Sequence, residues 1–201
     1  MSEIVIHGHP GSPLLRSVQI CCEEKGISYC LGSRGGEASA SERRALVAPF
    51  AGSPILEHGR LRIYETQVIL RYLDVKFPLP RLQPADAEGL GRMRQMMRTI
   101  ADVMSDPKPC VREINRLLGY KAFLAGDQLS LADLVLAPQL DLISLTPEGE
   151  RSLRRTALGR WLERMQARPS MRSTQPPHST QTLALLPPGL WRHSPGTRRL
   201  A

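Results

Sequence analysis

Aromatic residues are scarce in this chain, at 4% of its 201 residues. Proteins that bind single-stranded nucleic acid stack the bases on aromatic side chains set among basic ones, so this composition argues against that class. The start of the sequence does not resemble the leader of an exported protein, in which basic residues precede a long apolar run. Here Glu3 is acidic and the apolar run Ile4–Ile6 is short. The later apolar run Leu134–Pro138 is far below the ~20 residues that a membrane span needs. We therefore predict a soluble, cytoplasmic protein with no membrane partner.

Acidic residues are absent from the C-terminal end of the sequence. No acid follows Glu163 but six arginines do, and these leave residues 1–163 with only +2 of the total formal charge of +8. A nearly neutral body does not predict a nucleic-acid partner. Residues 173–201 are rich in Pro, Ser, Thr and Gln without a sustained apolar period, so we expect a disordered or loosely docked tail.

The four cysteines lack the spacing of a metal site or a redox pair. None of Cys21, Cys22, Cys30 and Cys110 forms a C-x-x-C motif, and no histidine lies near them in a ligand pattern. We therefore predict no metal. Cys21 and Cys22 fall on the apolar face of a predicted helix, where reduced cysteine behaves as a small hydrophobe, in keeping with a reducing cytoplasm.

A strand, a turn and a helix are predicted at the start of the chain. Ile4–Ile6 is expected to form a short buried strand and Gly8–Gly11 a turn. Ser12 is a good helix N-cap, Pro13 suits the first helical position and Gly26 suits the helix end. The apolar positions expected on the buried face of this helix are Leu14, Val18, Cys21 and Cys22.

The rest of the chain divides into a hairpin followed by helices. Residues 53–56 and 61–64 are predicted to pair around a turn at 57–60, and a helix is predicted to begin at Glu65. After a proline-rich linker the apolar pattern is wholly helical. Ser130–Asp133 resembles a capping box that opens a helix apolar nearly all round, so we expect that helix to be central and buried.

Several short motifs together resemble the cytosolic glutathione transferase family. The resemblance runs from about residue 4 to about residue 172 and is nearest to the serine-type, phi- and theta-like classes, in a bacterial-type form. The motifs that carry it, in chain order, are Gly8-His9-Pro10-x-Ser12-x-x-x-Arg16-x-Val18 with Glu24-Lys25-Gly26, Pro49-Phe50 with Pro54, Glu65-Thr66, Phe123-Leu124-Ala125-Gly126-Asp127 with Ser130-Leu131-Ala132-Asp133, and Arg168-Pro169-Ser170.

The resemblance implies an α/β plus all-α fold in two domains. An N-terminal thioredoxin-like domain that binds glutathione is expected at 1–78, and a C-terminal helical-bundle domain at 88–172. A linker at 79–87 is expected to join them, and the tail occupies 173–201.

By the same resemblance, Ser12 is the catalytic residue. Its hydroxyl would donate a hydrogen bond to the glutathione sulfur, and the nearby helix N–H groups would favour negative charge there. Both effects would stabilise the thiolate over the thiol and lower the thiol pKa. Without the resemblance, the residue pattern favours Ser12 as a plain N-cap.

Four residues are implied as glutathione ligands. Pro54 is expected to be cis, which would expose the backbone of Ser53 for strand-like pairing with the peptide part of glutathione. Glu65 would bind the γ-glutamyl ammonium, and the Thr66 hydroxyl with the helix amides would bind its carboxylate. Asp133, in contrast, is expected to be a structural cap of the buried helix.

The implied function is a glutathione transferase of detoxification type, with glutathione as co-substrate and a small hydrophobic electrophile as partner, acting as a homodimer. Conjugation, thiolysis and peroxide reduction all stay open. Ala51–Ser53 replaces the family's Gly-Lys-Val, and the stretch between Glu65 and Ser130 is shorter than usual. The alternative is therefore a glutathione-transferase-like ligand-binding or interaction protein with weak or no catalysis.

Overall fold

The computed structural model describes residues 3–32 and 54–176, apart from residues 102 and 104. Its first part is built around a mixed sheet with the strand order β2-β1-β3-β4, in which β1 is parallel to β2 and antiparallel to β3, and β3 is antiparallel to β4. The strands are β1 (Ile4–His7), β2 (Cys30–Leu31), β3 (Ile55–His58) and β4 (Leu61–Tyr64).

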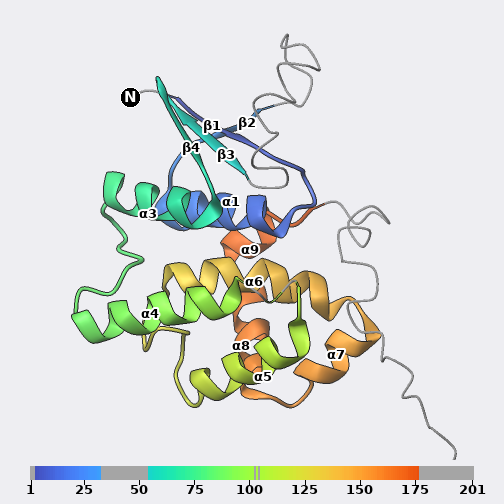
Figure 1. The fold of residues 1–201 in the computed structure, drawn as a ribbon. Helices are drawn as coiled ribbons and strands as arrows, with labels where there is room; N and C mark the ends of the chain where they lie inside the picture. Colours follow the sequence, from blue (N-terminus) through green and yellow to red (C-terminus); the bar gives the residue numbers. More distant parts are fainter. Residues whose placement is uncertain (1–2, 33–53, 102, 104, 177–201) are drawn as a thin grey trace, which may run out of the picture.

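Two helices, α1 (Pro13–Lys25) and α3 (Thr66–Lys76), pack beside this sheet (Figure 1). Helix α1 begins and ends where its capping residues predict. Ser12 is the N-cap in an extended conformation, and Gly26 ends the helix in the left-handed region at φ 61°. The strand, turn and helix at the start of the chain are therefore confirmed.

The buried face of α1 differs from the prediction. Leu14 is only half-buried, whereas Leu15 and Ile20 are fully enclosed. The reason is that α1 packs between the sheet and the second part of the molecule, so more than one of its faces is covered. Cys21 and Cys22 are completely buried, as predicted.

The hairpin is tighter than predicted. Glu57 and His58 belong to β3, and His58 pairs directly with Leu61, so only Gly59 and Arg60 form the turn. Gly59 has φ 63°, a conformation that favours glycine. The two-residue strand β2 was not predicted, because so short a run gives no readable period.

The second part is all-helical, as the apolar pattern predicts. In Figure 1 these helices lie together on the side of α1 and α3 away from the strands, and α9 contacts α1 and α8. They are α4 (Ala87–Ile100), α5 (Pro107–Leu118), α6 (Leu131–Ser144), α7 (Pro147–Leu153), α8 (Ala157–Gln166) and α9 (Pro169–Ser173).

Helix α6 is the centre of the helical part. All but two of its residues are buried, and it contacts α1, α3, α4, α7 and α8. The Ser130–Asp133 capping box at its start is present in both directions. The predicted central, buried helix is therefore confirmed, and the mixed sheet followed by a helical bundle is the predicted architecture.

Ion pairs tie α1 to its surroundings at the C-terminal end of the helix. Glu24 accepts two hydrogen bonds from the guanidinium of Arg168, at 2.7 and 2.8 Å. Lys25 is paired with Asp74 at 2.7 Å and also donates to the Pro80 carbonyl, which holds the segment after α3 in place. Within the described part of the chain, no helix is long and apolar enough to cross a membrane.

Candidate active site

One end of the sheet collects three of the predicted site segments. At this end a single row of paired residues crosses three strands. It joins the last residue of β1, the first residue of β3 and the last residue of β4. Ser12 follows β1 after a short turn, Pro54 directly precedes β3, and Glu65 directly follows β4. The register therefore brings residues far apart in sequence to the same end of the sheet. The residues of the row are His7, Ile55 and Tyr64.

Ser12 caps α1 through a long hydrogen bond. Its Oγ accepts from the Leu15 N–H at 3.5 Å, the outer limit of such a bond, so the cap is weak. The turn before it is held by other groups: the Ser12 N–H donates to the His9 carbonyl at 2.8 Å, and the Gly11 N–H donates to His9 Nδ1 at 3.2 Å. Among the residues that the structure describes, the Ser12 hydroxyl donates to no acceptor. Accepting the Leu15 N–H as a cap and donating to a ligand are therefore compatible for this hydroxyl.

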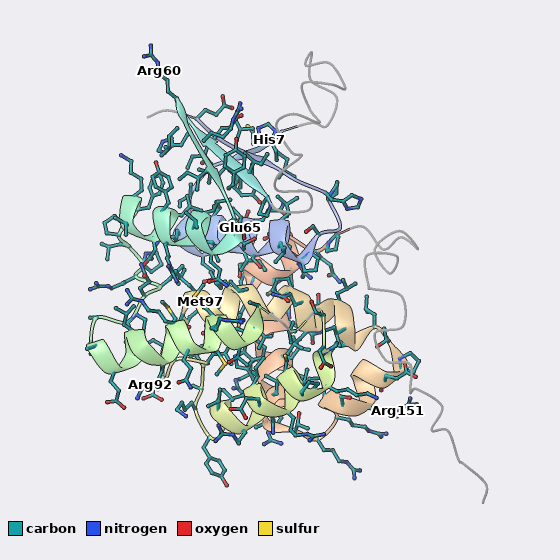
Figure 2. The ribbon with its side chains drawn as sticks, viewed as in Figure 1. His7, Arg60, Glu65, Arg92, Met97 and Arg151 are labelled. Carbon is teal, nitrogen blue, oxygen red and sulfur yellow. The ribbon has the colours of Figure 1, made fainter. Side chains whose placement is uncertain are left out.

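The start of α3 combines backbone strain with an unused hydroxyl. Glu65, labelled in Figure 2 where β4 meets α3, has φ 71°, which is uncommon for a residue with a side chain. Its side chain makes no capping hydrogen bond. Thr66 is 3% exposed, and its buried Oγ1 has no hydrogen-bond partner among the described residues. An unpaired buried hydroxyl costs roughly 1–3 kcal/mol, so this helix start has polar capacity that a ligand can use.

Pro54 is buried next to the first residue of β3. Ser53 lies outside the described residues, and so does the peptide bond that joins it to Pro54. The expected cis bond and the expected pairing of the Ser53 backbone with a ligand therefore stay predictions.

The start of α3 also touches the helical part. Gln67 Nε2 donates to the Met97 carbonyl on α4 at 3.4 Å, and Figure 2 shows Met97 on the side of α4 that faces α3. This contact places the candidate site where the two parts of the molecule meet.

A buried ion pair behind Ser12 was not predicted. Arg16, one helical turn after Ser12, pairs with Asp141 on α6. The signal available in the sequence was an arginine inside an otherwise enclosed helix, but its partner is 125 residues away and could not be identified without the fold.

The cysteines offer no reactive centre at this site. Burial raises the pKa of Cys21 well above its usual value, and burial followed by the charge of Glu23 raises the pKa of Cys22 to about 12. Over residues 3–32 and 54–176, no three His, Cys, Asp or Glu side chains are grouped to hold a metal ion. The predicted absence of a metal stays a prediction.

Comparison with known families gives two matches that follow each other along the chain. The model of the glutathione S-transferase N-terminal domain matches residues 6–81, and that of the glutathione S-transferase C-terminal domain matches residues 87–164. Together they span most of the 201 residues.

Among curated proteins, the chain is 26% identical to the stringent starvation protein A homolog of Coxiella burnetii, over 69% of this chain and 75% of that protein. It is also 26% identical to glutathione S-transferase F14 of Arabidopsis thaliana, over 77% of this chain and 76% of that protein. Among solved structures it resembles glutathione transferase Omega 2C from Trametes versicolor, with a TM-score of 0.73 and 18% identity over 87% of this chain and 93% of that one. With both domains matched in order on the predicted fold, the chain belongs to the glutathione S-transferase family.

Proposed function

We propose that the protein is a glutathione transferase that binds glutathione at the sheet end formed by Ser12, Pro54 and Glu65, and activates its thiol for attack on a small electrophile. The observation that carries the proposal is the buried Thr66 hydroxyl, which has no hydrogen-bond partner within residues 3–32 and 54–176 and follows the strained Glu65. A site that leaves a buried polar group unsatisfied in the free protein gains that hydrogen bond when a ligand binds. Family membership makes glutathione the ligand to test first.

The γ-glutamyl end of glutathione carries one ammonium and one carboxylate. In the proposed mode, the exposed Glu65 carboxylate binds the ammonium, while Thr66 Oγ1 and the first amides of α3 bind the carboxylate. The backbone of Ser53 before Pro54 pairs with the peptide part. The thiol then lies at the Ser12 hydroxyl, which donates to the sulfur and stabilises its anionic form.

The second substrate is proposed to be a small hydrophobic electrophile that approaches the thiolate from the helical part. The physiological role is then detoxification, and the place of action is the cytoplasm. All four cysteines are free thiols, which supports a reducing compartment. The proposed domain division stays 1–78 and 88–172, joined by the linker 79–87.

A homodimer is part of the proposal. Val68 and Val75 lie two turns apart on α3 and are 51% and 75% exposed, and Leu61 on the outer strand β4 is 45% exposed. Apolar side chains in such a row support a contact with a second subunit. Light scattering at micromolar concentration should give twice 22.3 kDa, and a monomer mass would contradict the dimer.

The alternative is a protein with the same fold that binds a ligand or partner without catalysis. One finding supports it: a relative named stringent starvation protein A homolog and a relative named glutathione S-transferase each match this chain at 26% identity. Sequence similarity alone does not separate the two.

Calorimetric titration with glutathione, followed by a panel of electrophiles and peroxides, tests the proposal. We expect binding at or below millimolar concentration and turnover with at least one acceptor. Glu65→Gln should weaken binding, whereas Glu88→Gln, which changes an exposed acid on α4, should leave it unchanged. Absence of binding at millimolar glutathione would favour the alternative.

A further inference from the structure

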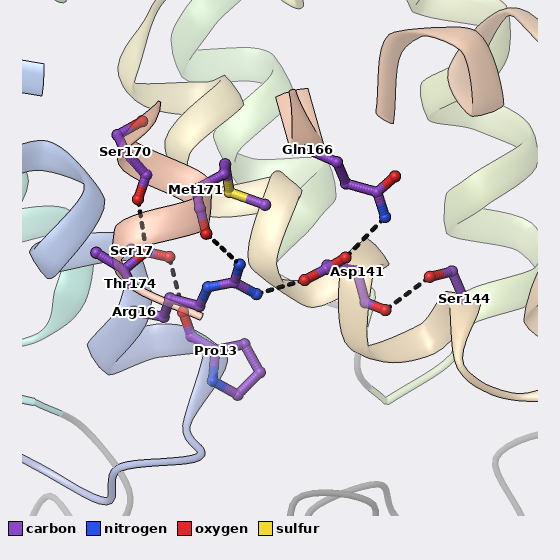
Figure 3. A network of polar contacts seen from close by, with 9 residues as sticks. All are labelled: Pro13, Arg16, Ser17, Asp141, Ser144, Gln166, Ser170, Met171 and Thr174. Atoms are coloured by element: carbon purple, nitrogen blue, oxygen red, sulfur yellow. Dashed lines mark hydrogen bonds and ion pairs between the residues drawn. The ribbon is translucent and has the colours of Figure 1, made fainter. Parts of the chain in front are cut away.

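Arg16 connects the first turns of α1 to the helical part of the molecule. It is only 6% exposed, and its guanidinium donates to the Asp141 carboxylate on α6 and to the Met171 carbonyl on α9, the latter at 2.8 Å. Figure 3 shows the guanidinium reaching both acceptors from α1. One side chain therefore fixes α1 to two separate helices at once.

The groups that receive Arg16 are themselves held in place. Asp141 Oδ1 accepts from Gln166 Nε2 of α8 at 2.7 Å, so both carboxylate oxygens are used. On the α1 side, the Ser17 hydroxyl donates to the Pro13 carbonyl at 3.0 Å, within the turn that follows Ser12. The Asp141 end of the contact is therefore tied to a third helix, and the α1 end lies in a turn with an additional internal hydrogen bond.

This ion pair is a poor device for stability alone. Arg16 Nε is buried without a hydrogen-bond partner in the described part of the chain, so the cation is incompletely compensated. Buried ion pairs often contribute no more to folding than apolar residues of similar size, and in some proteins they serve to fix one geometry.

The geometry that Arg16 imposes concerns Ser12. The two residues are four apart on α1, which is about 6 Å along the axis, on the same side of the helix. Because the cap bond of Ser12 is long, the position of its hydroxyl depends on where the first turn of α1 lies. A planar guanidinium that holds two acceptors fixes that turn more closely than a single charge would.

We propose that Arg16 is a positioning residue, which sets the place of the Ser12 hydroxyl by clamping the first turns of α1 to the helical part. The proposal rests on the proposed function of Ser12. If Arg16 positions Ser12 in this way, the second domain contributes to stabilisation of the glutathione thiolate without contacting glutathione.

The molecule supplies a matched control at the other end of the same helix. Glu24 and Arg168 form a second two-bond ion pair from α1 to the start of α9. Glu24 is twelve residues after Ser12, about 18 Å along the axis. A change there loosens the same interface far from Ser12 and leaves the bond of Arg16 to Asp141 on α6 untouched.

The experiment compares Arg16→Gln and Arg16→Lys with Arg168→Gln, in the full chain. For each we measure melting temperature, kcat, KM for glutathione and the fraction of bound glutathione that is thiolate at neutral pH, from its ultraviolet absorbance. We expect both glutamine variants to melt lower. Of these two, only Arg16→Gln should lower kcat, by about tenfold. The thiolate fraction should fall with kcat, while KM for glutathione should change less than about threefold. Arg16→Lys should lose less activity than Arg16→Gln, because lysine places a positive charge beside Asp141 but lacks the planar guanidinium.

Equal kcat in Arg16→Gln and Arg168→Gln would overturn the positioning role and leave the proposed function standing. Should Arg16→Gln fail to fold, Arg16→Lys and Gln166→Leu carry the test. Gln166 is exposed, and its replacement by leucine removes only one hydrogen bond to Asp141. Both should then lower kcat about two- to threefold relative to Arg168→Gln, and no difference would overturn the proposal. A wild-type protein without glutathione binding, or with a thiolate fraction that Ser12→Ala does not change, would overturn the proposed function and this inference with it.

Discussion

The starts of α3 and α6 differ in how completely their polar groups are used. At the start of α6, the buried Asp133 carboxylate accepts four hydrogen bonds from three residues. At the start of α3, Glu65 has a strained backbone and the buried Thr66 hydroxyl has no partner in the described part of the chain. The donors to Asp133 are Ser130 N–H and Oγ, Leu124 N–H and Trp161 Nε1, at 2.6–2.9 Å.

Under the proposed function, the start of α6 serves folding and the start of α3 serves binding. Burial raises the pKa of Asp133, and the hydrogen bonds from its four donors oppose only part of that rise, but they give both carboxylate oxygens partners where the group lies. Such a network fixes one arrangement of the core. The α3 start instead keeps unsatisfied polar capacity and strain, features that persist where a ligand is to be bound. Stability should therefore depend on Asp133 and glutathione affinity on Thr66.

The largest effect is expected from Asp133→Ala. It leaves the Trp161 and Leu124 donors buried without an acceptor, so we expect a loss of about 3–4 kcal/mol in the free energy of unfolding. That corresponds to roughly 10 °C in melting temperature for a chain of this size. Asp127→Ala, at an exposed acid on the same segment, is the control and should stay within about 0.5 kcal/mol. An unchanged melting temperature for Asp133→Ala would remove the contrast between the two helix starts.

Thr66→Val should change glutathione affinity much more than stability. Valine keeps the shape but removes the unpaired hydroxyl, so the free protein should be as stable as before or up to about 1 kcal/mol more stable. Glutathione affinity should fall about ten- to a hundredfold, the loss of roughly 1.5–3 kcal/mol expected for a hydrogen bond to a charged carboxylate. Calorimetry and thermal unfolding on the same sample measure both quantities. A lower melting temperature with unchanged affinity would make Thr66 a structural residue.

Glu24→Gln should show a smaller, pH-dependent effect. Burial alone would raise the pKa of Glu24, but hydrogen bonds from Arg168 and Ser170 and the charge of Arg168 outweigh it and hold the pKa below its usual value. A depressed carboxyl pKa stabilises the fold above the ordinary value near 4.5, and this stabilisation is lost as the pH falls through the folded-state pKa.

At neutral pH we therefore expect Glu24→Gln to cost about 1 kcal/mol, since the pair is partly exposed and screened. The difference from wild type should shrink as the pH falls below 4.5. A difference that grows in acid would contradict the assigned direction.

The smallest effect is expected from removal of residues 177–201. Their composition predicts little apolar burial, so the melting temperature should change by no more than a degree or two, as for about 0.5 kcal/mol. Removal from residue 173 onward is the comparison, because Thr174 is buried and donates to the Ser170 carbonyl at 2.7 Å. Equal melting temperatures for the two truncations would show that Thr174 does not contribute to the stability of the fold.

The parts of the fold that the sequence predicts are those set by local groups. Ser12 and Gly26 mark the ends of α1, and the Ser130–Asp133 box marks the start of α6, because capping uses neighbours within a few residues. The short helix α7 had a readable start as well: Thr146 Oγ1 accepts from the Gly149 N–H at 3.0 Å and Pro147 follows at the first helical position.

The parts that could not be predicted depend on distant contacts. Strand β2 is two residues long and exists through its pairing with β1, which no apolar period reveals. The pairs of Arg16 with Asp141 and of Glu24 with Arg168 join residues more than a hundred positions apart. At the candidate site, the residue types could be proposed from the sequence, but the unpaired Thr66 hydroxyl and the strain at Glu65 are visible only in three dimensions.

The most direct test of the proposed chemistry is the pKa of glutathione bound to the wild type and to Ser12→Ala, followed by the ultraviolet absorbance of the thiolate. A hydrogen bond to a charged group is worth roughly 1.5–3 kcal/mol, so we predict that Ser12→Ala raises the thiol pKa by about one to two units and slows turnover about ten- to a hundredfold. Glutathione affinity should stay nearly intact, because in the proposed mode Glu65 and Thr66 bind the other end of the molecule. A bound thiol with the same pKa and turnover in both proteins, and a Ser12→Ala variant that is only about 1 kcal/mol less stable, would contradict the mechanism and leave Ser12 as an N-cap.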